Sequence, residues 1–371
     1  MPSKLNSLAG ELLIVGFDGT EVSPVLKKML GQIQPAGVIL FARNLLNPQQ
    51  TFELLKNCQS EVSERLFTCV DLEGGRVDRF RNLTGPSPSA AEVFATGEPR
   101  LYRKHGELIG RICCALGFNV DFAPVLDLAF EASRKVMSSR AFSTDPAEVI
   151  LYAREFLRGL ASSKVIGAGK HFPGLGEGTL DSHHELPVIR KSLNRLWTED
   201  LVPYREMRRE LAMVLVNHAS YPEVTRGRLP ASLSRKWIAD ILRRKIGYRG
   251  LIVSDDLEMG GVLKAAPVGE AAVGFIAAGG DLALVCHEQK NVEAAYEAVV
   301  RESETSPAFR RRLRESAARV KAFKRKSAAL KQRVSSPSPE KIARLSTQLW
   351  EFSERVRLSA ISLAAAAGKI G

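Results

Sequence analysis

A loop rich in histidine and glycine carries the side chains best suited to acid–base chemistry. Residues 170–187 read KHFPGLGEGTLDSHHELP and hold three of the chain's six histidines. They follow a short apolar run at residues 164–168, and loops at the ends of strands often carry catalytic groups. Asp181 can fix the tautomer of His183 and raise its basicity, which leaves the other ring nitrogen free to exchange a proton with a substrate. A polar surface loop whose histidines have no catalytic role explains this composition equally well.

The composition is that of a large protein without a membrane span. The 371 residues are 45% hydrophobic, enough for one large domain or two. No apolar run is long enough to cross a bilayer, and residues 12–17 are too short for a secretory signal, so we expect a cytoplasmic protein. The five cysteines are odd in number and lack zinc-type spacing, which indicates buried free thiols.

The net charge of +12 is concentrated near the C-terminus. Residues 301–333 hold 12 Lys/Arg against 3 Glu. A basic helix of this kind could bind nucleic acid or an anionic surface. However, no stacking aromatics are interleaved with the charges, since Phe309 and Phe323 stand alone. We therefore expect a solvated helix face and no nucleic-acid partner.

Eight near-continuous apolar runs predict parallel strands that are buried on both faces. Helical patterns lie between most of them, and eight such units predict a closed (β/α)8 TIM-type barrel. An open doubly wound sheet would need a Gly-rich phosphate motif after its first strand, and residues 16–20 match that motif poorly. The predicted strands are residues 11–17, 37–42, 66–72, 119–125, 165–172, 213–219, 251–257 and 281–286. The predicted helices include residues 48–62, 101–116, 146–162, 193–211, 234–246 and 268–278.

Three segments make up the predicted domain organisation. Residues 1–334 form the catalytic barrel with its long basic C-terminal helix, residues 335–339 form a Ser/Pro linker, and residues 340–371 form a helical extension. Apolar residues recur in the extension at helical spacing, so we expect it to pack on the rest of the protein. They are Ile342, Leu345, Leu349, Phe352 and Val356.

Polar side chains recur at the ends of the predicted strands. Catalytic groups of a TIM barrel gather at the carboxyl ends of its strands, so these side chains should meet at one rim. Asp255 and Asp256 are adjacent on one strand and should point to opposite faces, so only one of them should face the barrel mouth. The rim residues are Asp71, Asp127, Lys170, His171, Asn217, His218, Asp255 and Asp256.

Taken in order, these motifs resemble those of the bacterial family 3 glycoside hydrolases, specifically the β-N-acetylglucosaminidases of cell-wall recycling. The resemblance covers roughly residues 8–290. The matching segments are GVILFARN at 37–44, DLEGGRVDR at 71–79, DFAPVLD at 121–127, RAF at 140–142, KHFPG at 170–174, DSH at 181–183, PAS at 230–232 and SDDLEM at 254–259.

The resemblance implies a retaining exo-hydrolase that removes terminal β-linked N-acetylglucosamine from peptidoglycan fragments. Asp255 would be the nucleophile, and His183, oriented by Asp181, would be the acid/base. No metal or organic cofactor is implied, and we expect a monomer. The residues that would hold the terminal sugar are Asp71, Arg79, Arg140, Lys170, His171 and, as a weaker candidate, His218.

The loop departs from the family pattern at two places. Leu175 stands where relatives carry a histidine, and Glu177-Gly178 replaces an Asp-Thr pair. The loop keeps its length as far as Asp181, so we expect the pair of Asp181 and His183 to form.

Other functions remain open on the same barrel. A metal-dependent hydrolase could use His171, His183 and His218. A phosphorylase is a further alternative, because a histidine acid/base tolerates a phosphate acceptor better than a carboxylate does. A broader β-glycosidase and a non-catalytic sugar-binding barrel complete the set, although the latter would have little reason to keep Asp255.

Overall fold

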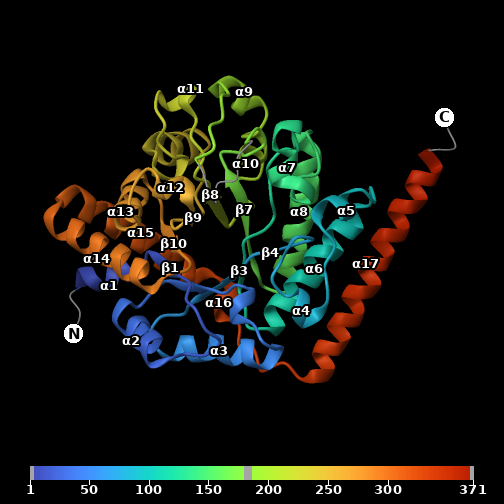
Figure 1. The fold of residues 1–371 in the computed structure, drawn as a ribbon, viewed down its shortest axis with the longest axis horizontal. Coiled ribbons are helices and arrows are strands. Elements are labelled where there is room, and N and C mark those ends of the chain that lie inside the picture. Colours follow the sequence, from blue (N-terminus) through green and yellow to red (C-terminus); the bar gives the residue numbers. More distant parts are fainter. Residues whose placement is uncertain (1–3, 179–185, 368–371) are drawn as a thin grey trace.

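The computed structural model describes residues 4–178 and 186–367, and its centre is a closed barrel of parallel strands (Figure 1). The strand order is β1-β10-β9-β8-β7-β6-β3-β2, and β1 closes the ring by pairing with both β2 and β10. The predicted (β/α)8 fold is therefore confirmed. The barrel strands are β1 (Leu13–Val15), β2 (Gly37–Ile39), β3 (Phe67–Val70), β6 (Val120–Asp121), β7 (Ile166–Phe172), β8 (Met213–Val216), β9 (Leu251–Asp256) and β10 (Leu282–Val285).

Helices surround the barrel (Figure 1), and most of the predicted helices are present. The helix expected over residues 193–211 is wrong, because the chain forms two short helices there. Pro203 lies in the first turn of the second helix and has no amide hydrogen to continue an earlier one. The main helices are α1 (Lys4–Gly10), α2 (Pro24–Ile33), α3 (Pro48–Ser60), α4 (Arg81–Thr84), α5 (Ala90–Phe94), α6 (Pro99–Ala115), α8 (Pro146–Ser162), α9 (Leu193–Thr198), α10 (Val202–Glu206), η5 (Lys236–Lys245), α13 (Val268–Ala278), α14 (Gln289–Thr305), α15 (Pro307–Lys326), α16 (Ala328–Lys331) and α17 (Pro339–Ala367).

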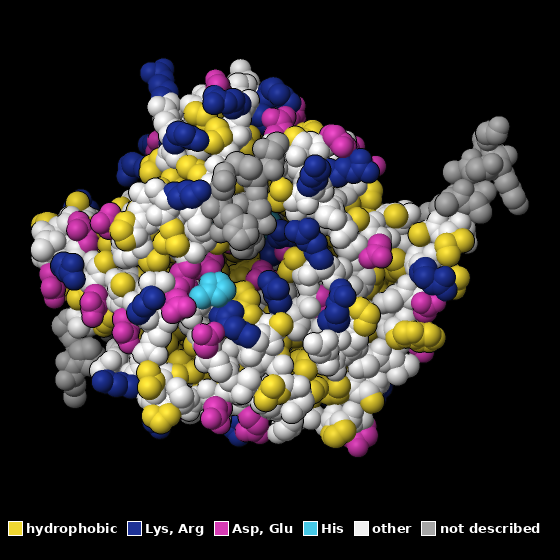
Figure 2. All heavy atoms as spheres, viewed as in Figure 1, with side chains coloured by type: hydrophobic (Ala, Val, Ile, Leu, Met, Phe, Trp, Pro, Cys, Tyr) yellow, Lys and Arg dark blue, Asp and Glu magenta, His cyan; other side chains and the backbone are white. Residues whose placement is uncertain are grey.

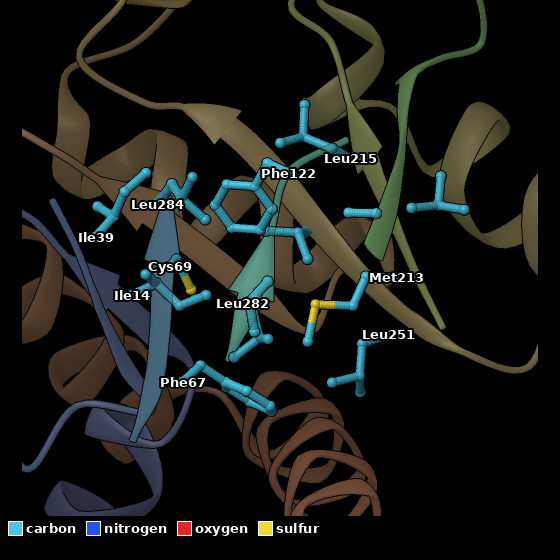
Figure 3. Close-up of a cluster of buried hydrophobic side chains, with 14 of the residues drawn as sticks. Ile14, Ile39, Phe67, Cys69, Phe122, Met213, Leu215, Leu251, Leu282 and Leu284 are labelled. Atoms are coloured by element: carbon cyan, nitrogen blue, oxygen red, sulfur yellow. The ribbon is translucent and has the colours of Figure 1, made fainter. Parts of the chain in front are cut away.

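Apolar side chains fill the inside of the barrel (Figure 3). Phe67, Met213 and Leu251 come from β3, β8 and β9 and are fully buried. Phe122 and Leu284 also belong to this cluster and at the same time line the cavity described below. Part of the barrel core thus forms the bottom of the candidate site, so the shape of the site depends on how the barrel packs.

A small hairpin interrupts the β/α pattern after β3. It pairs β4 (Leu72–Gly74) with β5 (Val77–Asp78) in antiparallel fashion. Gly74 and Gly75 adopt φ values of 85° and 60°, which favour glycine. A Cβ at Gly74 would lie 2.0 Å from the carbonyl oxygen of Pro88, so only glycine fits. The hairpin carries Glu73 and leads to Arg79, both of which belong to the site.

The basic helix α15 is only partly solvated, which corrects the sequence expectation. Asp281, directly before β10, is fully buried and accepts hydrogen bonds from Arg243 of η5 and Arg319 of α15. Lys324 is also buried, with its Nζ 3.8 Å from Glu11 Oε2. One charged face of α15 is therefore anchored to acidic groups beneath the barrel, and the rest faces solvent.

The C-terminal helix α17 packs against α4, α5 and α6. Leu345, Leu349, Phe352 and Val356 are buried as predicted, and the ring of Phe352 stacks on His105 of α6 at 5.8 Å. Residues 332–338, between α16 and α17, form neither helix nor strand. No helix in the described ranges is both long and apolar enough to cross a membrane.

Candidate active site

A cavity of about 480 Å³ opens at the carboxyl ends of the barrel strands. Asp71 follows β3, Asp255 and Asp256 end β9, and all three carboxylates line the cavity with Arg79 and His287. The volume is typical of a pocket for a small ligand. Side chains of both charges gather around the hollowed centre of this face (Figure 2). The predicted convergence at one rim therefore holds for Asp71, Arg79 and Asp255.

Asp255 and Asp256 both face this cavity, so the expected alternation is wrong. Val253 lies opposite Leu282, whereas Asp256 lies opposite Leu284, so β9 contributes one residue more than β10 over this stretch. Such a bulge breaks the alternation of side chains along a strand. The two carboxylates nevertheless differ in their contacts.

Asp256 is held by neighbouring groups, whereas Asp255 is much less constrained. One Asp256 oxygen accepts a hydrogen bond from the Glu258 amide at 3.1 Å, and the other lies 3.1 Å from Nε2 of His287. Among the described residues, Asp255 Oδ1 accepts one bond, from the Asp256 amide at 3.0 Å. Asp255 is therefore the carboxylate with more capacity left for a substrate.

Beside the cavity, five residues form a continuous network of ion pairs and hydrogen bonds. Four of them are predicted site residues, and the fifth is Glu73. Lys170 Nζ lies 2.8 Å from Asp71 Oδ1 and 2.6 Å from Glu73 Oε1. Arg140 binds Glu73 through two hydrogen bonds, of 2.7 and 2.8 Å. Arg140 also lies 3.1 Å from Nε2 of His171. The network thus links Asp71, which lines the cavity, to side chains from β4, β7 and the segment before α8.

Asp127 extends the network through its contact with His171. Its Oδ2 lies 2.6 Å from Nδ1 of His171, and its Oδ1 accepts the Leu175 amide hydrogen at 2.7 Å. The His171 ring is therefore fixed from both sides. Leu175, the departure from the family pattern, is a buried core residue here.

In this network, charge pairing affects the pKa values of the ionisable groups more strongly than burial does. Burial alone would raise the pKa of Asp71, but the Lys170 ammonium and the Arg79 guanidinium hold that pKa below its usual value. Burial would also raise the pKa of Glu73, yet Arg140 and Lys170 lower it strongly. In return, Asp71 and Glu73 raise the pKa of Lys170 against the effect of its burial. All of these groups therefore remain charged at neutral pH.

Arg79 offers an unused donor in this environment. Its Nε is buried and has no hydrogen-bond partner among the described residues. Its guanidinium lies 5.5 Å from the centre of the Phe41 ring. Buried donors in folded proteins are nearly always paired, so this unpaired Nε is an exception.

His218 is fully buried, with both ring nitrogens bonded within the protein. Nε2 lies 2.8 Å from the Asp256 carbonyl oxygen, which can only accept, so Nε2 carries the hydrogen. Nδ1 then accepts from the Ser232 hydroxyl at 2.7 Å. Burial lowers the pKa of His218, which suits this neutral form. The geometry speaks against the predicted sugar contact, because His218 instead holds the end of β9.

His287 belongs to the cavity although the sequence assigned it no role. Its ring stacks on Phe41 at 5.5 Å, and its bond with Asp256 raises the pKa of the imidazole. Glu73 was likewise given no role. Both residues had a local signal: Glu73 lies two residues after Asp71 in the DLEGG motif, and His287 directly follows the predicted strand at residues 281–286.

Asp181 and His183 lie outside the described residues, so their predicted pairing stays a prediction. The described residues before and after this segment form ion pairs. Lys191 is fully buried, with its Nζ 2.6 Å from Asp200 Oδ2 and 3.6 Å from Glu177 Oε1. Glu177 and Lys191 therefore bring together the two ends of the segment that carries the predicted dyad.

The fold and the site together define a barrel enzyme, because a carboxylate-lined cavity at the carboxyl ends of eight parallel strands is where such enzymes do their chemistry. The family follows from a direct match. Residues 4–322 match the model of the Glycosyl hydrolase family 3 N terminal domain. The chain therefore belongs to glycosyl hydrolase family 3 and is a glycoside hydrolase.

Known relatives agree with this assignment. A beta-hexosaminidase of Pseudomonas aeruginosa is 35% identical over 306 residues, covering 81% of this chain and 90% of the relative. A beta-hexosaminidase of Idiomarina loihiensis is 32% identical over 347 residues, covering 92% and 98%. Among solved structures, a family 3 beta-N-acetylglucosaminidase from a Paenibacillus species superposes with a TM-score of 0.88 at 32% identity, covering 95% of this chain and 69% of that one.

Proposed function

We propose that this enzyme is a retaining exo-β-N-acetylglucosaminidase that releases terminal N-acetylglucosamine from peptidoglycan fragments. One observation carries the proposal. Asp255, a lightly bonded carboxylate, shares a cavity with Asp71 and Arg79, and Asp71 joins the ion-paired network of Lys170 and its partners. The names of the relatives, beta-hexosaminidase and beta-N-acetylglucosaminidase, support the choice of sugar.

The proposed reaction has two steps. The Asp255 carboxylate attacks the anomeric carbon while His183 donates a proton to the leaving glycosidic oxygen, which gives a glycosyl ester and the free aglycone. His183 then accepts a proton from water as the water oxygen attacks the anomeric carbon, which releases the sugar and restores Asp255. Two inversions give net retention. Asp181 would keep the His183 ring oriented and favour its charged form.

The ion-paired network would hold the hydroxyls of the terminal sugar. Asp71 can accept a hydrogen bond from a hydroxyl, whereas Arg79 and Lys170 can donate to one. Arg140 and His171 would complete this set behind the sugar. Because the charged groups pair with one another inside the protein, they are oriented before substrate arrives, and less ordering is needed on binding.

We extend the proposal to the setting of the enzyme. The substrate would be a muropeptide with N-acetylglucosamine at its non-reducing end, and the enzyme would act as a monomer in the cytoplasm without a cofactor. All five cysteines are free thiols, which suits a reducing compartment.

The nucleophile is tested by Asp255→Ala, with Asp256→Asn as the matched control in the same cavity. We expect Asp255→Ala to lower kcat on 4-nitrophenyl N-acetylglucosaminide by at least about 10⁴-fold. Asp256→Asn should lose far less, since Asp256 contacts His287 and the Glu258 amide. A 2-fluoro or 5-fluoro sugar should trap a covalent adduct on Asp255, detectable by peptide mass. Near-normal turnover by Asp255→Ala would remove Asp255 from the mechanism.

The acid/base is tested by His183→Ala, with His184→Ala as the adjacent control. Substrates with poor leaving groups should lose about 10²–10⁴-fold in His183→Ala, and activated aryl substrates far less, because only the former need a proton. Equal losses on both substrates would argue against an acid role. The reactions should be run with and without phosphate, since release of a sugar 1-phosphate would identify a phosphorylase instead.

A further inference from the structure

Two adjoining hollows lie at the opposite end of the barrel from the candidate active site. They have volumes of about 370 and 200 Å³, and both are lined by Cys114, Ser163, Lys164 and Gln332. The chain crosses this end of the barrel between α16 and α17 (Figure 1). We call the two hollows together the basal groove. It is separate from the active-site cavity and shares no lining residue with it.

The basal groove is strongly basic and carries no compensating acid. Lys56, Arg65, Lys164 and Arg333 line the first hollow. The second hollow adds Arg111, Lys341 and Arg344, and neither contains an aspartate or glutamate. Within the described ranges, the side chains of these seven residues form no ion pair and no hydrogen bond with another protein group. Clustered like charges repel one another and favour a bound anion.

An apolar wall accompanies these charges. Phe52, Leu55, Leu66 and Phe118 line the first hollow beside the cations. Their side chains are mostly or fully buried. A groove with a basic rim and an apolar wall matches a ligand that has a charged part and an organic body.

Lys164 lies at the centre of the groove and adopts an unusual backbone conformation. It lines both hollows and joins α8 to β7 with a φ of 57°, a region that glycine occupies far more readily than lysine. The chain thus keeps a cation at a position where the backbone favours glycine. The same conformation makes Lys164→Gly a mild substitution, because it removes the charge while suiting the backbone.

We propose that the basal groove binds a small organic anion that carries at least two phosphate groups. Each phosphate group brings a charge of about −1.5 to −2 at neutral pH, so two phosphates compensate more of the seven cations than one phosphate can. The apolar wall contacts the organic body, and the cations contact the phosphates. A nucleoside diphosphate has this chemistry, and ADP serves as the probe.

Calorimetric titration tests the proposal with ADP, inorganic pyrophosphate and adenosine, without magnesium and at low salt (about 50 mM NaCl). ADP should bind with one site per chain and more tightly than pyrophosphate, and adenosine should bind far more weakly. The variant Lys164→Gly should weaken ADP binding by about fivefold or more, and the triple variant Arg65→Ala/Lys164→Gly/Arg333→Ala by at least about tenfold. Glycosidase activity reports that each variant is folded.

A matched triple variant removes the same charge elsewhere. Arg311, Arg314 and Arg325 are exposed residues of α15 that do not line the groove. Their joint replacement by alanine should change ADP affinity by less than about twofold if the groove is specific. Three results would overturn the proposal: no measurable ADP binding, an equal loss in this control, or pyrophosphate binding as tightly as ADP. Preferential, groove-dependent binding of a single-stranded oligonucleotide would also overturn it in favour of a nucleic-acid surface.

Discussion

Replacing Glu73 by glutamine should expose how much the site depends on one buried charge. The Glu73 side chain is 4% exposed and faces Lys170 at 2.6 Å and Arg140 at 2.7 Å. Glutamine has the same shape but no charge, and its amide group would face a cation. Removing one partner of a buried ion pair costs about 3–5 kcal/mol, because the remaining charges lose their compensation. For a chain of 371 residues, that loss corresponds to a fall in Tm of about 4–6 °C.

A matched control separates burial from pairing. Glu210 binds Arg154 through two hydrogen bonds of 2.7 and 2.9 Å, but their side chains are 39% and 33% exposed. Glu210→Gln should therefore cost at most about 1 kcal/mol, since water replaces the lost partner. The two variants remove the same bidentate geometry from an interior and a surface position.

The assay combines thermal unfolding, followed by circular dichroism, with kcat and KM on an aryl N-acetylglucosaminide. We expect a higher KM for Glu73→Gln because Lys170 and Arg140 lose the group that orients them. The pKa of Glu73 is lowered in the native state from its ordinary value of 4.5. Its contribution is therefore complete above about pH 4.5 and is lost as the pH falls toward the native pKa. The Tm gap between wild type and variant should accordingly narrow only in acid. A Tm and KM within error of those of wild type at pH 7 would refute this reasoning.

Two further predictions concern buried groups outside the network. Lys191→Met should lower the free energy of unfolding by about 3–5 kcal/mol, because it leaves the Asp200 carboxylate buried without its ammonium partner. Arg195 is exposed, so Arg195→Met should cost at most about 1 kcal/mol in the same thermal unfolding assay. Equal losses in the two variants would contradict this prediction. Burial lowers the pKa of His105 from 6.5 to about 3, so native stability should fall by up to about 5 kcal/mol as pH drops from 6.5 to 3. His105→Phe should flatten this part of the Tm–pH curve, and an unchanged slope would show that protonation of His105 does not cause the loss of stability. The substitution also removes the ring nitrogen that lies beside the Tyr152 hydroxyl.

Much of the fold is readable from local pattern. Apolar runs buried on both faces predicted all eight barrel strands, because a strand inside a barrel ring must be apolar along its length. The placement of Asp71 and Asp255 followed from the same logic, since both end such runs. The break at Pro203 was also encoded in the sequence, and the predicted helix over residues 193–211 overlooked it.

The composition of the site depended on contacts between distant parts of the chain. Glu73 meets Arg140 across 67 residues, and no local period reports such a pairing. His287 enters the cavity through its contact with Asp256, whereas His218 turns inward to a backbone carbonyl.

The sequence by itself determined which residues end the strands and therefore which side chains reach the rim. Only the tertiary structure decided how they point. The bulge between β9 and β10 turned both Asp255 and Asp256 toward one cavity, because the direction of a side chain depends on the register with the neighbouring strand. Strand register is a property of two segments packed together, so no pattern within either segment alone could supply it.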